Sequence, residues 1–203
     1  MRESVSPGPM SVAEYLRFEE ASTVRHEYVH GEVFVMVGGT YRHSQIALNI
    51  AAHVKPAARG SCHVLLNGMK VQAAVDVIYY PDVVVECVAR HGEELVLDQP
   101  CVVVEVTSRS TRRIDRGEKL DAYRRMPSLR AYLIVDQTRR RVSHHWRDAD
   151  GTWMSEEITD AGTIDLPCAK TRLTLDEIYE DVELPPLGVA EPEWDSEESY
   201  STE

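Results

Sequence analysis

Long apolar runs are absent from this 203-residue chain. No stretch approaches the roughly 18 consecutive apolar residues that a membrane-spanning helix requires. The first nine residues also lack the apolar centre of a secretory signal peptide. Both absences argue against membrane insertion and export, so we expect a cytoplasmic protein with no membrane partner. The hydrophobic fraction of 43% is that of an ordinary globular protein, and the length suits one domain with a sizeable core.

Cysteine is sparse and scattered. The chain has four cysteines, none of them in a C-x-x-C pair: Cys62, Cys87, Cys101 and Cys168. Without close spacing, the sequence predicts neither a zinc knuckle nor a disulfide framework. Cys87 and Cys101 lie in apolar runs, where a free cysteine behaves as a small buried hydrophobe.

Positive charge is scarce overall but concentrated in one segment. The net charge is −12, yet residues 109–147 hold twelve Lys or Arg against four Asp or Glu. Residues 185–203 hold six acids and no Lys or Arg. A basic zone within an acidic chain can attract a polyanion locally. The alternative, slightly favoured by composition alone, is a solvated basic helix face paired with acids elsewhere.

Hydrophobic spacing and turn residues predict an α/β fold, a mixed β-sheet flanked by helices in a single domain. Three segments are expected: a disordered N-terminus at 1–10, a folded domain at 11–184, and an acidic disordered tail at 185–203. Helices are expected at 11–18 (opened by a Ser11–Glu14 capping box), at 41–55 (closed by Pro56 and Gly60), at 115–126 and at 174–179. Strands are expected at 31–37, 83–85, 101–107 and 131–136, with hairpins at 63–75 around Asn67-Gly68 and at 140–158.

One short motif matches the zinc-protease signature H-E-x-x-H: His26-Glu27-Tyr28-Val29-His30. That chemistry needs both histidines on one face of a sustained helix, with the glutamate as general base. Gly31 follows at once and a β-branched strand begins by Val33, so little helix is available. A zinc metalloprotease is therefore a remote alternative, and two surface histidines at a helix-to-strand junction are the preferred interpretation.

Two acids lie next to neighbouring buried strands. Asp82 precedes Val83-Val84-Val85, and Glu105 lies within the run 101–107. Carboxylates beside buried strands need a positive partner, and a divalent cation together with Lys119 from the following helix would supply one. Such a group suits phosphodiester hydrolysis, in which the lysine positions water or neutralises charge. A Pro-Asp turn plus an edge acid paired with arginine is an equal alternative on these residues alone.

Several motifs in order resemble the Uma-two family of the PD-(D/E)XK nuclease superfamily. They are the opening 25–35 with Glu27 and Gly31-Glu32, Arg42-His43 before the long helix, Tyr80-Pro81-Asp82, the strand-and-loop 103–111, the helix Asp115-Arg116-Gly117-Glu118-Lys119 with Tyr123, and the strand 129–136. The resemblance spans about residues 10–183 and rests on order and spacing together. Thr107 and Arg109 depart from the family pattern beside Glu105, and neither removes a metal ligand or the lysine.

The resemblance implies a restriction-endonuclease-like fold and a Mg²⁺- or Mn²⁺-dependent endonuclease acting on DNA. It implies Asp82, Glu105 and the Val106 carbonyl as metal ligands, Lys119 as the catalytic lysine, and Glu32 and His43 as further site members. We expect phosphate contacts from the basic segment, namely Arg109, Arg112, Arg113 and Arg116. Cutting both strands with one site per chain favours a homodimer. The alternative from another class is a non-catalytic nuclease fold serving as a binding or interaction module.

Overall fold

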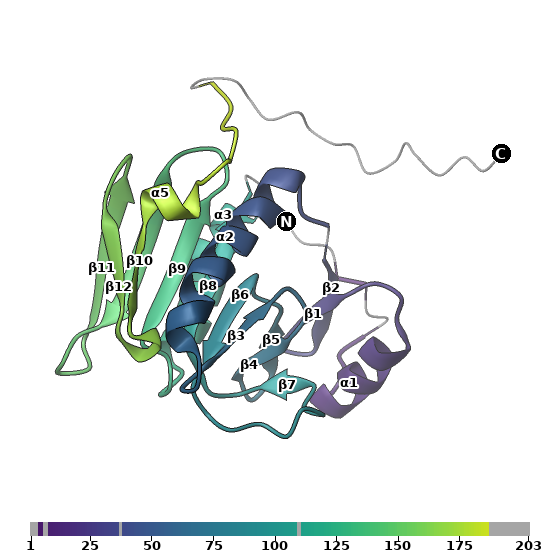
Figure 1. Cartoon of the computed structure of the whole chain (residues 1–203). Helices are drawn as coiled ribbons and strands as arrows, with labels where there is room; N and C mark the ends of the chain where they lie inside the picture. The colour runs from purple at the N-terminus through teal and green to yellow at the C-terminus, as the bar shows by residue number, and fades with distance from the viewer. Residues whose placement is uncertain (1–3, 6–7, 37, 109–110, 187–203) are drawn as a thin grey trace.

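A six-stranded mixed sheet, here called the central sheet, forms the middle of the molecule (Figure 1). The computed structural model describes residues 4–5, 8–36, 38–108 and 111–186. The order of the strands across the central sheet is β11 (Trp153–Thr159), β10 (Arg141–Arg147), β9 (Ala131–Asp136), β8 (Pro100–Thr107), β6 (Val83–Glu86) and β3 (His63–Leu66). β8 and β9 are parallel and every other pair is antiparallel. The mixed sheet that the sequence predicted is therefore confirmed.

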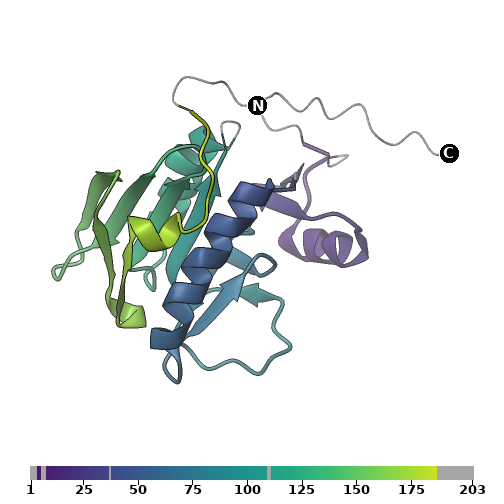
Figure 2. The ribbon, with the colours of Figure 1, turned by 45° about the horizontal axis from the view of Figure 1, so that its top comes forward.

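The long helix α2 (Tyr41–Ala58) crosses one face of the central sheet, as Figure 2 shows. Its buried residues recur at helical spacing and pack on the valines of β6 and β8: Ile46, Ala47, Ile50, Ala51 and Val54. Thr40 caps the helix by accepting a hydrogen bond from the His43 N–H. The same core includes the hairpin β12 (Thr163–Leu166) and β13 (Thr171–Thr174), the turn η2 (Pro167–Ala169), and α5 (Leu175–Ile178).

A second sheet lies against the other face. The order of its strands is β2 (Glu32–Val35), β1 (His26–Val29), β5 (Val77–Tyr79), β4 (Lys70–Ala74) and β7 (Val96–Leu97). A continuous helical segment packs beside it: α3 (Arg112–Ile114), the π-helical turn η1 (Asp115–Lys119) and α4 (Leu120–Arg124). The buried core between the layers includes Val84 and Val103 of the central sheet and Tyr79 and Tyr123 from the opposite side. Helix α1 (Val12–Ala21) covers β1 and β2 through Tyr15, Tyr28 and Val33.

The prediction of a hairpin around Asn67-Gly68 is wrong. β3 pairs with β6 in the central sheet, whereas β4 pairs with β5 in the second sheet. Asn67 and Gly68, with φ of 40° and 152°, form the corner at which the chain passes between the two sheets. Asn-Gly is typical of a tight turn because both residues tolerate positive φ. The same tolerance allows the sharp bend by which the chain leaves one sheet and enters the other.

Other boundaries also differ. Helix α2 continues through Pro56 to Ala58. Part of the segment expected to be disordered is ordered, because the Val5 N–H bonds to the Val33 carbonyl and the Met10 N–H to the Gly31 carbonyl. The Ser11–Glu14 capping box, the β10–β11 hairpin and the short helix α5 agree with the sequence predictions. The strands β1, β5, β7, β12 and β13 were not expected. The predicted acidic tail lies outside the described residues from 187 onward. None of the helices in the described part is long and apolar enough to cross a membrane.

The prediction about cysteine is wrong as well. Cys62 is joined to Cys87, and Cys101 to Cys168, as disulfides. Cys87 and Cys101 were both expected to be buried. Cys101 is buried, but Cys87 is exposed. Sequence separations of 25 and 67 residues hide this proximity, which the pairing of β3 with β6 and the position of η2 create.

Candidate active site

Asp82 and Glu105 lie on the same face of two neighbouring strands. Asp82 immediately precedes β6, and its N–H bonds to the Val104 carbonyl at 3.1 Å. The Asp82 carboxylate accepts the Val106 N–H through Oδ2 at 2.7 Å. Because the N–H and C=O of a strand residue point to the same side, the Val106 carbonyl is directed toward this edge too. The two acids and the carbonyl that the resemblance implies are thus brought together.

Lys119 reaches Glu105 from the π-helical turn η1. Its Nζ lies 3.0 Å from Glu105 Oε1, 2.8 Å from Glu27 Oε1 and 3.5 Å from Asp115 Oδ1. A π-helical turn displaces side chains from ordinary helical positions and is frequent at functional sites. Here it accompanies Asp115 and Lys119 turning inward together, and both are buried. The lysine expected on the helix after β8 therefore does meet the acid of β8.

Tyrosines border the ion-paired group formed by Lys119 with Glu27, Glu105 and Asp115. Tyr123, one turn beyond Lys119, donates its hydroxyl to Glu105 Oε1 at 3.2 Å. The ring of Tyr79 lies 5.3 Å from Lys119 Nζ, within the range of a cation–π contact. The tyrosine rings exclude water from one side of the group, which strengthens the electrostatic interactions there.

Burial and charge shift the pKa values in a consistent way. Burial raises the pKa of Glu105 well above its usual value, against the lowering effect of Lys119, and the nearby charges of Asp115 and Asp82 raise it further. Burial alone would lower the pKa of Lys119, but Glu105, Glu27 and Asp115 outweigh it and raise that pKa well above normal. The three carboxylates therefore favour the protonated, cationic form of Lys119.

His43 connects the start of α2 to the acid of β6. Its Nε2 lies 2.8 Å from Asp82 Oδ1. Burial opposes protonation of this imidazole, yet the hydrogen bond and charge of Asp82 prevail and raise the pKa of His43 above its ordinary value. With Val106 on Oδ2 and His43 on Oδ1, both oxygens of Asp82 are held in place. His43 thus acts on the orientation and charge of Asp82.

The donor set suits a hard divalent cation. Four buried carboxylates, between 1% and 9% exposed, face the two bases Lys119 and His43: Glu27, Asp82, Glu105 and Asp115. The acids outnumber the bases in a place where water cannot screen them, and burial raises the pKa of Glu105 and of Asp115, so a divalent cation would offset the cost of ionising them. Carboxylate and carbonyl oxygens are the ligands that Mg²⁺ and Mn²⁺ prefer. The residues present therefore fit the metal that the resemblance implies.

Glu27, and not Glu32, joins this group. Glu32 is exposed at the start of β2 and makes no hydrogen bond or ion pair with the group in the part of the chain that the structure describes. Glu27 lies on β1 of the second sheet and approaches Lys119 more closely than Glu105 does. The sequence showed that Glu27 belongs to the motif 25–35. It did not show that residues 26–29 form a strand, which is what directs the Glu27 side chain inward.

The H-E-x-x-H residues do not form a zinc site. His26 to Val29 is a strand, not a helix. His26 is buried and its Nδ1 bonds to Glu19, whereas His30 lies in a turn with its Nδ1 bonded to Asp76. The two imidazoles therefore have separate partners, and the interpretation of both as surface histidines is wrong for His26.

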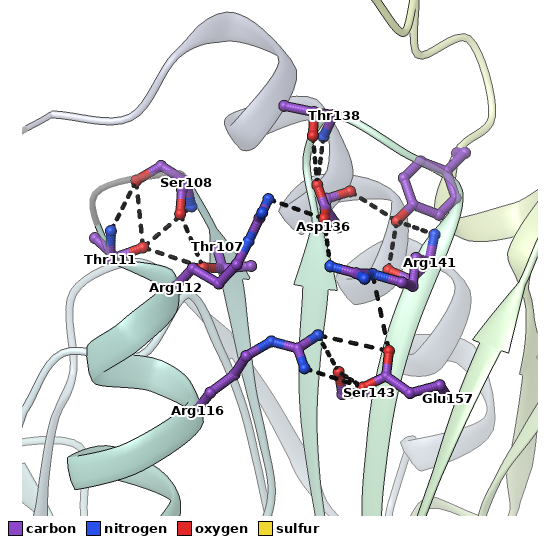
Figure 3. A network of polar contacts seen from close by, with 11 residues as sticks. Thr107, Ser108, Thr111, Arg112, Arg116, Asp136, Thr138, Arg141, Ser143 and Glu157 are labelled. Carbon is purple, nitrogen blue, oxygen red and sulfur yellow. Dashed lines mark hydrogen bonds and ion pairs between the residues drawn. The ribbon is translucent and has the colours of Figure 1, made fainter. Parts of the chain in front are cut away.

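The basic segment is engaged in ion pairs (Figure 3). Arg112 donates to Asp136 at 3.0 Å, and Arg116 donates to Ser143 and Glu157. Arg113 is exposed, and Arg109 lies outside the described residues. Burial would raise the pKa of Asp136, but hydrogen bonds from Thr138 and the charges of Arg112 and Arg141 lower it overall. Two of the four predicted phosphate ligands are thus paired with acids of the same chain.

Comparisons with known proteins agree with this architecture. A family model, Uma2, described as "Putative restriction endonuclease", matches residues 12–176. Two uncharacterised proteins of Synechocystis sp. are similar to this chain. One is 31% identical, and the match covers 84% of this chain and 91% of that protein. The other is 29% identical, and the match covers 73% of this chain and 87% of that protein. A crystal structure from Anabaena variabilis, described as "a putative nuclease belonging to DUF820", has the same fold, with a TM-score of 0.71, 13% identity, and coverage of 84% of this chain and 98% of its own. The chain belongs to the Uma2 family, and its fold is that expected of the PD-(D/E)XK nuclease superfamily.

Proposed function

We propose that this protein is a metal-dependent endonuclease that hydrolyses phosphodiester bonds of DNA. The observation that carries the proposal is the meeting of Asp82, Glu105 and Lys119 from three separate elements, in contact or close proximity although buried. A purely structural role would be met more simply by apolar side chains, because buried charges are costly. The family match and the fold support a nuclease.

Asp82, Glu105 and the Val106 carbonyl would hold Mg²⁺ or Mn²⁺. When bound, such an ion supplies charge stabilisation at the scissile phosphate and lowers the pKa of an attacking water. Lys119 and Tyr123 both bind Oε1 of Glu105, which leaves Oε2 as the oxygen available to a cation among the contacts described. Val106 and His43 fix the carboxylate of Asp82 in one orientation.

Lys119 would act as a permanent positive charge. Its three carboxylate partners orient the ammonium group and keep it protonated. A charged donor next to a phosphate stabilises the negative charge that develops on the nonbridging oxygens, and it can hold the attacking water by a hydrogen bond.

DNA would approach the site along the basic segment. Arg113 is exposed and available to a phosphate, whereas Arg112 and Arg116 would exchange their carboxylate partners for phosphates on binding. Such an exchange keeps each arginine charge-paired, and it makes affinity depend on salt. A homodimer would supply the second site that cutting both strands requires, and sedimentation with and without duplex would measure that assembly.

The binding of Mn²⁺ measured by calorimetry tests the metal site. We expect near-stoichiometric binding by the wild type and by the control Glu93→Gln, which neutralises an exposed acid in a loop. Binding should be lost in Asp82→Asn and in Glu105→Gln. Lys119→Met should keep Mn²⁺ binding but lose cleavage of plasmid DNA. Absence of Mn²⁺ binding both with and without duplex, or cleavage unchanged by Asp82→Asn, would refute the proposal.

A non-catalytic binding module is the second candidate. It is favoured by one observation: Arg112 and Arg116 are already neutralised by Asp136 and Glu157, so the surface is less basic than the sequence suggests. In that case duplex binding would persist in Asp82→Asn, and no metal would stimulate cleavage by the wild type. The same set of variants therefore separates the two functions.

A further inference from the structure

All four cysteines of the chain meet at the end of the central sheet from which β8 starts. Cys62 comes just before β3 and Cys87 just after β6, and these positions face each other because His63 pairs with Glu86. Cys101 lies at the start of β8, and Cys168 lies in the turn η2 between β12 and β13. Four segments distant in sequence thus each contribute one sulfur.

The sulfurs form one cluster and not two separate pairs. The Sγ atoms of Cys87, Cys101 and Cys168 all lie within 4.8 Å of one another. The Cys62 Sγ is 3.3 Å from the Cys168 carbonyl oxygen, and the Cys87 Sγ is 3.9 Å from the same atom. Each disulfide could form without the other nearby, so their convergence is a separate observation that disulfide bonding does not explain.

Four cysteine sulfurs at one point match the ligand set of a structural zinc site. Zinc binds four thiolates tetrahedrally at about 2.3 Å, which places the sulfurs about 3.8 Å apart. Three of the sulfurs, those of Cys87, Cys101 and Cys168, already lie within 4.8 Å of one another, and the Cys62 sulfur is bonded to that of Cys87. Cys87 is exposed while Cys101 is buried, so the cluster lies at the protein surface on one side and against the core on the other. Soft thiolates select zinc over Mg²⁺.

The cluster is distinct from the carboxylate site. Cys101 and Glu105 are four positions apart on β8, about 13 Å along an extended strand. The carboxylates offer hard oxygen ligands and the cysteines offer soft sulfur ligands, so the two places select different ions. A zinc ion here would tie β3, β6 and β8 to the turn η2, and would leave the proposed active site unaltered.

We propose that the reduced thiolates of Cys62, Cys87, Cys101 and Cys168 form a structural Zn²⁺ site. The two disulfides are the oxidised, metal-free form of the same cluster. A water-soluble phosphine converts one form to the other: each disulfide gains two electrons from phosphorus and two protons, water supplies the oxygen of the phosphine oxide, and two thiols result. Zinc binding then displaces the thiol protons into solvent.

The test loads the full-length protein, reduced with phosphine, with Zn²⁺ and separately with Co²⁺. We expect one zinc per chain after gel filtration, together with the intense visible absorption of a tetrahedral cobalt thiolate. The double variant Cys87→Ser/Cys168→Ser removes one sulfur from each disulfide pair and should weaken zinc binding by more than about 100-fold, beyond the loss typical of an outer-shell change. Zinc should also raise the melting temperature of the reduced wild type but not of this variant.

Two further variants keep the proposal falsifiable. His30→Ala removes the exposed histidine of the H-E-x-x-H segment and should retain one zinc per chain. Cys87→Ser alone changes an exposed side chain, so it should fold even if the double variant does not. The proposal is overturned if the reduced, folded wild type binds no zinc or cobalt, if Cys87→Ser binds zinc as tightly as the wild type, or if His30→Ala loses the ion.

Discussion

Glu27 Oε1 lies 2.8 Å from Lys119 Nζ and is the shortest of the three carboxylate contacts to that lysine. The contact joins β1 of the second sheet to the helix that follows the central strand β8. It places Glu27 in contact with Lys119, whereas Glu32, the further site member that the resemblance implied, is exposed on β2.

Replacing the two glutamates separately tests that assignment. Glu27→Gln should lower DNA cleavage by about 10-fold or more, because Lys119 loses a charged partner that orients it. Glu32→Gln should change cleavage by less than about 2-fold, since the side chain is exposed and lies outside the group. Initial rates at saturating Mn²⁺ measure both. Equal losses in the two variants would contradict the geometry.

Replacing His43 should weaken the metal site without removing a ligand. His43→Ala deletes the hydrogen bond from the imidazole to Asp82 Oδ1, so the carboxylate is no longer held by α2. We expect Mn²⁺ affinity to fall by about 10- to 100-fold, the usual effect of losing an outer partner of a metal ligand. Calorimetry provides the measurement, with His53→Ala on the same helix as the control. Unchanged affinity in His43→Ala would exclude this positioning role.

Replacing Asp136 should affect stability and DNA binding in opposite directions. Asp136→Asn leaves Arg112 and Arg141 without their shared carboxylate and should lower the free energy of unfolding by about 2–4 kcal/mol. The same change frees Arg112 for phosphate, so DNA affinity should rise and depend more steeply on salt. Urea unfolding and a salt titration of binding measure the two effects. Asp150→Asn, at an exposed turn, is the matched control.

Stability should also depend on pH through His145. Burial, assisted by the nearby charge of Arg124, lowers the pKa of this imidazole to about 4. In the unfolded chain its pKa is about 6.5, so between pH 6.5 and 4 the unfolded state takes up a proton that the folded state does not. The free energy of unfolding should therefore fall as the pH drops through that range, by on the order of 1–2 kcal/mol from this residue.

His145→Gln isolates this contribution. The difference in the free energy of unfolding between wild type and variant should be constant above pH 7 and should shift in favour of the variant toward pH 4. A difference that is independent of pH would show that His145 does not titrate in this way. His144, whose pKa burial also lowers, remains in both proteins.

The local parts of the site could be predicted from the sequence. Asp82 and Glu105 belong to short β-branched runs whose burial is evident from composition, and strands close in sequence often pair. Lys119 shares a helix face with Tyr123, and both do reach Glu105. These predictions depend on spacing within one or two neighbouring elements.

The non-local parts could not be predicted. Glu27 reaches the site only because β1 belongs to a second sheet, whereas the hairpin expected at Asn67-Gly68 would have paired β4 with β3 and not with β5 of that sheet. The ion pairs of Arg112 with Asp136 and of Arg116 with Glu157 join residues more than 20 positions apart. Spacing along the chain carries no information about which of several acids a given arginine will meet.

The position of Lys119 between the two sheets has a consequence for how the protein would lose activity. Its carboxylate partners come from the second sheet through Glu27, from the central sheet through Glu105 and from its own helix through Asp115. Opening of the second sheet alone would break the first contact while the central sheet remained folded. Inactivation by mild denaturant should therefore precede global unfolding, with the amides of β1 and β5 exchanging hydrogen before those of β8.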